Sequence, residues 1–369
     1  MILMKKLFAL ILVFAALLSF SACKDELYPP VESTEEESRV LMTFKIGKDE
    51  YNVKYELYRA LFLNYAQEYD GGDRSFWSTA ESEDAKAKIN ERIEGMCADI
   101  YSVIHHAKSI GYDVYSADAD TIVAQLVSKS VNGYVDGESN FEGFGGDYDA
   151  YLAALREMNL NYSVQDLLYR YSIATEKINE YYAGKKDESS FAPQNGALCA
   201  TDDEIRAFYY GEDAVRVLLV TLDSRSYTHT RAEEIRNKIN SLADEKEVSS
   251  YIVSFTATAA EDAFDGVLIG RYSLDSAFYS AVTKSAFSLG IGQASDIVEV
   301  STGDTSCYYI LYRVEKSDDH LTEKSESIRD VYIANEIGKR LANDKNALLS
   351  SLEKTENYNS IIHSQISMP

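Results

Sequence analysis

The chain has little proline, cysteine and positive charge for its 369 residues: 4 Pro, 4 Cys, one Trp, and 36 Lys+Arg against 60 Asp+Glu. So few cysteines exclude a small disulfide-stapled scaffold, and 4 Pro with 19 Gly exclude a collagen-like chain. The formal net charge of −24 opposes binding to phosphate backbones, which requires Lys and Arg to displace counterions. We therefore expect no nucleic-acid partner. What remains is a globular composition with a length typical of about two domains.

The apolar run near the N-terminus is too short to cross a bilayer. It extends from Leu7 to Phe20 after Lys5 and Lys6, and its 14 residues fall short of the roughly 20 that a spanning helix needs. This pattern is typical of a signal peptide. The sequence Phe20-Ser21-Ala22-Cys23 at its end resembles the lipobox at which bacterial lipoproteins are cleaved and acylated on the Cys.

Cys23 is accordingly expected to begin the mature chain as a lipidated residue, after a signal peptide at 1–22 and before a polar spacer at 23–39. Loss of Lys5 and Lys6 leaves 34 basic residues and a balance of −26, which an anionic lipid surface repels. Attachment would therefore come from buried lipid chains, at about 0.8 kcal/mol per CH₂. We expect an extracytoplasmic protein anchored to the bacterial cell membrane. The alternative is a plain secreted protein in which Cys23 is incidental.

Besides the lipidated Cys23, three cysteines remain in the mature chain, an odd number for an oxidising compartment. Cys97, Cys199 and Cys307 show no CxxC or Cys/His spacing, and we interpret them as buried small apolar residues. A bridge between Cys97 and Cys199 stays open, because pairing cannot be inferred from sequence.

The N-terminal half, residues 40–182, is predicted to be all-α after a hairpin-like start. Residues 40–46 and 51–53 are β-prone around the turn residues 47–50. From Lys54 onward, apolar residues recur at spacings of 3 and 4, which indicates about five amphipathic helices that end at glycines or turns. Their stripes are marked by Tyr58, Leu61, Phe62 and Tyr65; by Ile89, Ile93, Met96 and Ile100; by Ile122, Leu126 and Val127; by Tyr151 and Leu155; and by Leu167, Leu168, Tyr171 and Ile178.

The second half mixes strands and helices after a break at 183–200, which we interpret as a linker or insertion. Thr201 and Glu204 form a capping-box pattern that opens a helix. Residues 215–222 and 307–314 are predicted strands, with another at 296–300 and a helical stripe between them. The predicted α+β domain covers 201–316, and a C-terminal helix and tail cover 317–369.

Familiar catalytic and metal-binding motifs are missing. No HExxH, GxSxG or GxxxxGK[ST] occurs, so zincin, α/β-hydrolase and P-loop chemistry lack support. Neighbouring residues on a helix point about 100° apart, so His105 and His106 cannot chelate one metal from one face. The acidic loop of Asp136, Glu138, Glu142, Asp147 and Asp149 lacks EF-hand spacing and is interpreted as solvated. No metal and no cofactor is expected. The 28 Tyr offer amphipathic area for holding polypeptide, although most should be core.

Several segments carry a family resemblance. The segments at 107–114, 144–152 and the long helix to Tyr182 resemble the helical chaperone domain of PrsA/SurA-type foldases. The segments at 215–220, 266–270 (Gly-Val-Leu-Ile-Gly) and 287–293 (Phe-Ser-Leu-Gly-Ile-Gly-Gln) resemble the first strand, Gly loop and Phe-x-Leu-x-x-Gly-Glu element of a parvulin-type prolyl isomerase domain. The resemblance implies an α+β fold: an all-α chaperone domain like the N-terminal domain of SurA, completed by a C-terminal helix, and a parvulin-like α+β domain.

The resemblance also implies where a proline-containing peptide would bind. Tyr272, Leu274 and Phe278 fall where the family lines its proline pocket, with Ile269 beneath them and Ser306 and Tyr309 in the last strand. Active parvulins usually carry His in the first and last strands, where this chain has Val217 and Tyr309, and Asp262 is the nearest candidate for the acidic position. A dry apolar pocket favours the twisted amide even without acid–base groups, so weak isomerisation is compatible with these replacements.

Together these patterns predict a membrane-anchored foldase for exported proteins. It would bind unfolded or proline-containing polypeptides and isomerise X-Pro bonds weakly or not at all. One alternative is a non-catalytic cell-envelope scaffold lipoprotein on the same fold. Another is a structural lipoprotein whose parvulin-like fold retains no pocket.

Overall fold

The computed structural model describes residues 28–136, 139–184, 196–198, 200–242, 244–254, 265–273, 280–302 and 305–368. The predicted signal peptide, Cys23 and most of the 183–200 linker lie outside these ranges. The chain divides into two compact units, one of residues 1–178 with 341–369 and the other of residues 179–340. Unit 1 and unit 2 are described separately below. Both contain helices and sheets, and the fold is α+β.

Unit 1 contains the helices that the 3- and 4-residue spacings predict. They are α3 (Tyr55–Asp70), α4 (Ser82–Ser109), α5 (Ala117–Asn132), α6 (Tyr148–Glu157) and the part of α7 (Tyr162–Ala183) up to Ile178. The structure adds the short helix α2 (Glu35–Ser38) within the predicted spacer and a 3₁₀ turn at Arg74–Ser78. Glycine ends α3 as predicted: Gly71 has φ 57°, and its N–H bonds the carbonyl of Gln67, so the chain leaves the helix in a left-handed conformation.

The structure adds two small sheets to this helical half. Strand β1 (Val40–Ile46) pairs with β2 (Asp49–Lys54), as the hairpin-like pattern predicts, and also with β9 (Glu353–Lys354) from the C-terminus. A second hairpin joins β3 (Tyr134–Asp136) and β4 (Ser139–Phe141) in the predicted acidic loop. Short segments α15 (Glu356–Asn359) and the 3₁₀ turn His363–Gln365 complete the unit.

The described part of the predicted polar spacer is docked on unit 1. The ring of Tyr28 stacks on Tyr148 at 4.9 Å, and the Tyr148 hydroxyl donates to the carbonyl of Pro29 at 2.7 Å. Glu37 in α2 bonds Arg59 at 2.7 Å. Although partial burial acts the other way, hydrogen bonds from Thr34 and Arg59 lower the pKa of Glu37 to about 2. Residues 28–38 therefore form part of the folded unit and do not serve as a free tether.

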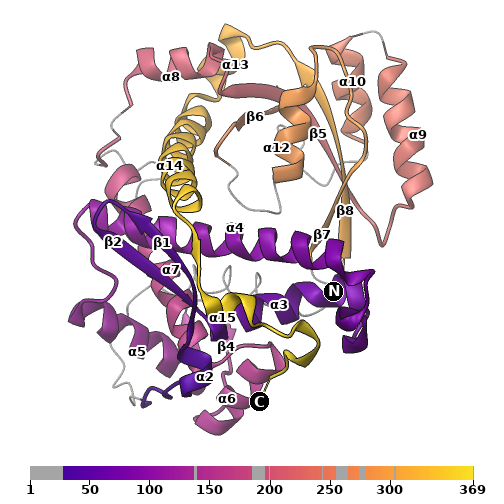
Figure 1. Ribbon diagram of the computed structural model, residues 1–369. Helices are drawn as coiled ribbons and strands as arrows, with labels where there is room; N and C mark the ends of the chain where they lie inside the picture. The colour runs from indigo at the N-terminus through magenta and orange to yellow at the C-terminus, as the bar shows by residue number, and fades with distance from the viewer. Residues whose placement is uncertain are drawn as a thin grey trace. The chain divides into compact units, whose positions relative to one another are not determined.

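Unit 2 is built on a four-stranded antiparallel sheet in the order β6-β5-β8-β7 (Figure 1). The strands are β6 (Val267–Gly270), β5 (Ala214–Asp223), β8 (Thr305–Val314) and β7 (Val298–Thr302). Its described helices are α8 (Asp202–Tyr210), α9 (His229–Asn240), α10 (Glu245–Ile252), α12 (Ser280–Ser288), α13 (Asp318–Glu323) and the first part of α14 (Ser325–Ser350). The predicted capping box of α8 is present, since Thr201 and Glu204 each bond the other's backbone N–H.

Strand alternation gives the sheet two apolar faces (Figure 1). Even-numbered residues of β5 and β8, such as Leu218 and Ile310, pack against α9 and α10. Odd-numbered residues, such as Val217 and Leu311, pack with α12. Because side chains alternate with a period of two, the parity of a residue number in these strands decides which face it occupies.

The cysteines and histidines singled out in the sequence differ in their surroundings. Cys97 is free and fully buried, and burial raises the pKa of its thiol. Cys307 is free but only partly buried, which corrects the expectation that it is a core residue, and Cys199 lies outside the described residues. His105 contacts the Tyr51 hydroxyl at 3.1 Å, whereas His106 contacts Asp344 at 2.7 Å, so the two rings have separate structural partners. Within the described ranges, no helix is both long and apolar enough to cross a membrane.

Candidate functional site

The structure brings two of the predicted proline-pocket residues to one face of the unit 2 sheet. Ile269 in β6 and Tyr309 in β8 both belong to the apolar cluster beneath α12, together with Val217. Val217 is 0% exposed, and Val282 and Ala286 of α12 pack into the same cluster. Val217, for which the resemblance predicts correspondence to the family's first His, is therefore an interior residue surrounded by hydrocarbon.

Two other predicted residues lie elsewhere. Ser306 has the parity of Tyr308 and Ile310, which places it on the α9/α10 face, opposite Tyr309. Tyr272 is held at α14, where its backbone N–H donates to Asn335 Oδ1 at 2.9 Å. Leu274, Phe278 and Asp262 lie outside the described residues, so their predicted roles stay predictions.

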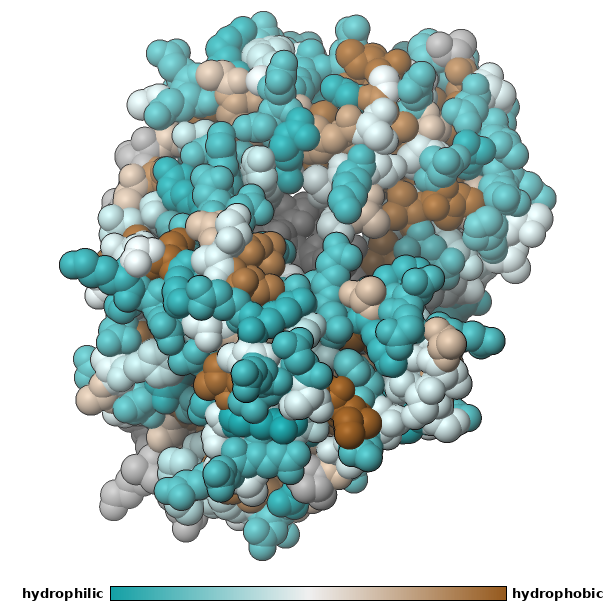
Figure 2. Space-filling model, in the orientation of Figure 1, coloured by the Kyte–Doolittle hydropathy of each residue, from teal (hydrophilic) through white to brown (hydrophobic). Residues whose placement is uncertain are grey.

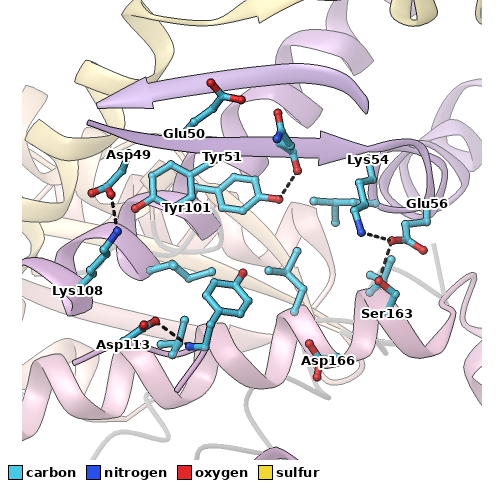
Figure 3. Close-up of a pocket in the computed structure, with 17 residues that line it drawn as sticks. Asp49, Glu50, Tyr51, Lys54, Glu56, Tyr101, Lys108, Asp113, Ser163 and Asp166 are labelled. Atoms are coloured by element: carbon cyan, nitrogen blue, oxygen red, sulfur yellow. Dashed lines mark hydrogen bonds and ion pairs between the residues drawn. The ribbon is translucent and has the colours of Figure 1, made fainter. Parts of the chain in front are cut away.

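The cavity that the structure does describe lies in unit 1 and has a volume of about 480 Å³. We name it the tyrosine cleft (Figure 3). Its walls come from β2, α3, α4, the loop after α4 and α7. It is lined by Asp49, Glu50, Tyr51, Asn52, Lys54, Glu56, Leu57, Tyr101, Ile104, Lys108, Asp113, Val114, Tyr115, Ser163, Val164, Asp166 and Leu167.

Three tyrosines give the cleft its apolar area. Tyr51 and Tyr101 stack at 5.3 Å beneath β2, and burial raises the pKa of both hydroxyls, so both stay neutral. Tyr115 enters from the loop after α4 and is 54% exposed. The guanidinium of Arg170 lies 4.9 Å from the centre of its ring and steadies it from α7.

Charged groups line the cleft in pairs. Lys108 bonds Asp49 at one end, and Glu56 accepts from Ser163 at 2.7 Å and lies 3.9 Å from Lys54 at the other. The Asp49 contacts with Lys108 and His105 lower the pKa of Asp49, so it stays ionised at neutral pH. Asp166 bonds Arg170 at 2.7 Å. The lining holds five carboxylates against two lysines, and the cleft is thus net negative.

This arrangement is suited to binding rather than to covalent catalysis. Ser163, the hydroxyl that α7 contributes to the lining, donates to the Glu56 carboxylate at 2.7 Å. His105 is engaged by Tyr51 and Asp49. Within the described ranges, no group of three or more His, Cys, Asp or Glu side chains is placed to hold a metal ion. Amphipathic rings beside paired charges offer contact area and hydrogen bonds to a peptide.

Sequence reasoning noted the abundance of tyrosine but did not find this cleft. One local signal was present in β2, where buried Tyr51 and Val53 alternate with exposed Glu50, Asn52 and Lys54. That alternation identifies a strand with one solvent-exposed face. It does not reveal that α7, more than 100 residues later, forms the facing wall.

Comparison with known proteins gives matches among solved structures. No family model and no curated protein matches the chain. The foldase protein PrsA of Streptococcus pneumoniae matches at 15% identity over 82% of this chain and 93% of that chain, with a TM-score of 0.26. PrsA of Bacillus subtilis matches at 12% identity over 81% and 88%, with a TM-score of 0.23. The peptidylprolyl isomerase PrsA of Bacillus anthracis matches at 16% identity over 68% and 93%, with a TM-score of 0.25.

The chain is similar to PrsA foldases. The surface in Figure 2 is mostly hydrophilic, with its hydrophobic side chains in small scattered groups, so that face presents no single large apolar patch. The tyrosine cleft is therefore the feature on which the inference of function rests.

Proposed function

We propose that this chain is a foldase-type chaperone that binds unfolded polypeptide in the tyrosine cleft of unit 1. The observation that carries the proposal is a cavity of about 480 Å³ lined by three tyrosines and by ionised side chains. Its volume falls in the range of about 300–1,000 Å³ that is usual for binding pockets. The PrsA/SurA-type pattern in the sequence predicts the same class of function.

The chemistry of the lining suits clients of many sequences. Tyrosine supplies a large contact area at a low entropy cost because it has only two side-chain torsions. Its hydroxyl and the nearby carboxylates accept hydrogen bonds from any peptide backbone. Such a site holds a chain without reading a particular sequence, which a chaperone requires.

The proposed location follows from the N-terminal sequence. We propose that Cys23 carries the lipid that anchors the protein to the outer face of the bacterial cell membrane, where it would meet exported chains before they fold. The net charge of −24 makes lipid insertion, rather than electrostatic adsorption, the means of attachment.

Prolyl isomerisation is proposed only as a weak activity of unit 2. Val217 and Tyr309 replace the usual histidines, and Val217 lies within hydrocarbon. The alternative remains a non-catalytic scaffold lipoprotein, for which one tightly held partner and no general client binding would be expected.

The test is suppression of aggregation. Protein from residue 24 onward is mixed at stoichiometric amounts with a chemically unfolded client, and light scattering is followed. We expect the wild type to slow aggregation and Tyr115→Ala to slow it several-fold less, because the exposed ring contributes contact area of the kind that anchors interfaces. Tyr181→Ala is the matched control, since Tyr181 is 47% exposed but lies in unit 2.

If wild type and Tyr115→Ala suppressed aggregation equally, the tyrosine cleft would not be the client-binding site. A wild type that leaves aggregation unchanged would overturn the chaperone function itself and favour the scaffold.

A further inference from the structure

Strand β2 is an edge strand along the cleft. The sheet order β2-β1-β9 leaves β2 with a strand on one side only among the described residues. Asp49, Glu50, Tyr51, Asn52 and Lys54 of this strand all line the cavity. An edge strand presents backbone N–H and C=O groups to whatever lies beside it, and here the cavity lies beside it.

The backbone groups that face the cleft can be assigned. Gly47 and Lys48 form a two-residue turn, so the flanking pair Ile46 and Asp49 exchange hydrogen bonds across the hairpin. Successive residues of a strand alternate in the direction of their backbone N–H and C=O groups. Those of Tyr51 and Val53 therefore point toward β1, and those of Glu50 and Asn52 point away from β1. Tyr101 confirms this independently, because its hydroxyl donates to the Asn52 carbonyl at 2.9 Å from the cavity side (Figure 3).

The facing wall is one side of α7. Ser163, Val164, Asp166 and Leu167 are spaced so that they share a helix face, and all four line the cavity. The space is thus bounded by a strand edge and an amphipathic helix face, which is the environment of a strand within a layered sheet. Figure 3 shows the stacked rings of Tyr51 and Tyr101 between these two walls.

The charge of the lining selects the occupant. Five carboxylates face two lysines, and the whole chain is strongly acidic. Tyrosine faces attract cations, and more strongly when they are shielded from water. A segment with Lys or Arg among apolar residues complements both features, whereas an acidic segment is repelled.

We propose that the tyrosine cleft holds its client as an extended, basic segment that pairs with the edge of β2. This rests on the proposed function and names its binding mode and substrate class. Backbone pairing with the outward groups of Glu50 and with the outward N–H of Asn52 supplies affinity independent of sequence, while the Asn52 carbonyl keeps its hydrogen bond from Tyr101. The tyrosines and carboxylates favour alternating apolar and basic side chains. The six residues of β2 correspond to a bound segment of about 20 Å.

The test uses a blocked hexapeptide of alternating Lys and Val with a fluorescent label, titrated with the protein from residue 24 onward. Two derivatives carry N-methyl groups on the three Lys or on the three Val amides, which removes the donors along one edge of the peptide strand. We expect one derivative to lose at least about tenfold in affinity and the other to bind within about threefold of the parent. A Glu/Val hexapeptide should bind at least about tenfold more weakly than the parent.

A protein variant tests the same pairing from the other side. Asn52→Pro removes the N–H of residue 52, which points away from β1, so the hydrogen bonds between β1 and β2 are kept. An edge strand tolerates proline at such a position. Asn52→Pro should lower the affinity for the parent peptide by about tenfold. Asn52→Ala keeps the N–H and should leave the affinity unchanged. Circular dichroism shows whether both variants are folded, and the methylated peptides test the proposal in the wild type if the proline variant is not.

The possible outcomes distinguish failure of this binding mode from failure of the proposed chaperone function on which it rests. Equal affinity of all three Lys/Val peptides would overturn strand addition while leaving client binding in place. Equal affinity of the Lys/Val and Glu/Val peptides would overturn the basic occupant. No binding of any hexapeptide, with aggregation still suppressed, would overturn this binding mode alone, whereas loss of both would overturn the proposed function too.

Discussion

Single buried residues decide how unit 2 could act on prolyl bonds. Val217 and Tyr309 stand at the positions that the resemblance predicts for the family's histidines, and Val217 is buried in the apolar cluster that includes Val282 and Ala286 of α12. We expect cis/trans exchange of an X-Pro peptide, followed by NMR, to be accelerated weakly or not at all. Phe278→Ala should abolish any acceleration, whereas Ser306→Ala should leave it unchanged because Ser306 lies on the opposite face of the sheet. Loss in both variants would contradict that placement of the site.

His363 is the residue whose titration should be visible in stability. Its ring lies among Tyr58, Phe62 and Trp77, with centroid distances of 6.4, 5.2 and 6.5 Å. The Tyr58 hydroxyl donates to Asn90 at 2.6 Å and contacts His363 Nε2 at 3.0 Å, so the network assigns a proton to Nε2, which donates to the Tyr58 oxygen. Burial lowers the pKa of His363 to about 4.

The pH dependence follows from that shift. The unfolded chain binds a proton near pH 6.5 and the folded chain only near 4, so the unfolded state holds more protons between these values. The stability contributed by His363 is therefore present above pH 6.5 and lost as the pH falls toward 4. We expect His363→Phe, which keeps an aromatic ring, to flatten the decline in urea-unfolding free energy over this window. His229→Phe is the exposed control, and equal slopes for His363→Phe and wild type would contradict the prediction.

At the scale of elements, the close approach of α14 to the backbone of Tyr272 requires a glycine at position 338. A Cβ added to Gly338 in α14 would lie 2.1 Å from the carbonyl oxygen of Tyr272, which is backbone and cannot turn aside. Gly95 in α4 has nothing within 4 Å of the same atom. Gly338→Ala should therefore lower the free energy of unfolding by about 1–3 kcal/mol, and Gly95→Ala should raise it by about 0.5–1 kcal/mol.

Denaturant unfolding of the two variants measures this difference in sign. Tyrosine fluorescence and circular dichroism follow both units together, and the matched substitution keeps the change in helix propensity constant. If Gly338→Ala were as stable as Gly95→Ala, the contact between α14 and Tyr272 would be looser than the structure has it.

At the scale of the whole molecule, charge and lipid act in opposite directions. The balance of −26 expected for the mature chain repels anionic lipid, so the proposed membrane attachment would depend on acylation at Cys23. We expect Cys23→Ser to move the protein from the membrane to the soluble fraction and to leave the N-terminus uncleaved at that site. Cys307→Ser is the control. Membrane retention of Cys23→Ser would favour another means of attachment.

The sequence by itself determined the parts whose signals are local. Helices α3 to α7, the β1–β2 hairpin, the capping box of α8 and strands β5 and β8 follow from periodicity, turns and caps, because each signal lies within the element it specifies. Alternation also specifies that each strand has two faces. Ile269 and Tyr309, which the family resemblance groups in one pocket, share one apolar cluster in the structure, and their role in binding proline stays a prediction.

Only the tertiary structure decided what meets across long distances in sequence. Strand β9 is two charged residues without a strand signature, and it exists because Met42 and Thr43 offer an open edge about 310 residues earlier. The separation of Ser306 from Tyr309 required the register of β8, since one step along a strand changes the face. The tyrosine cleft required α7 to fold back against β2, which depends on burial of apolar surface and on no local pattern.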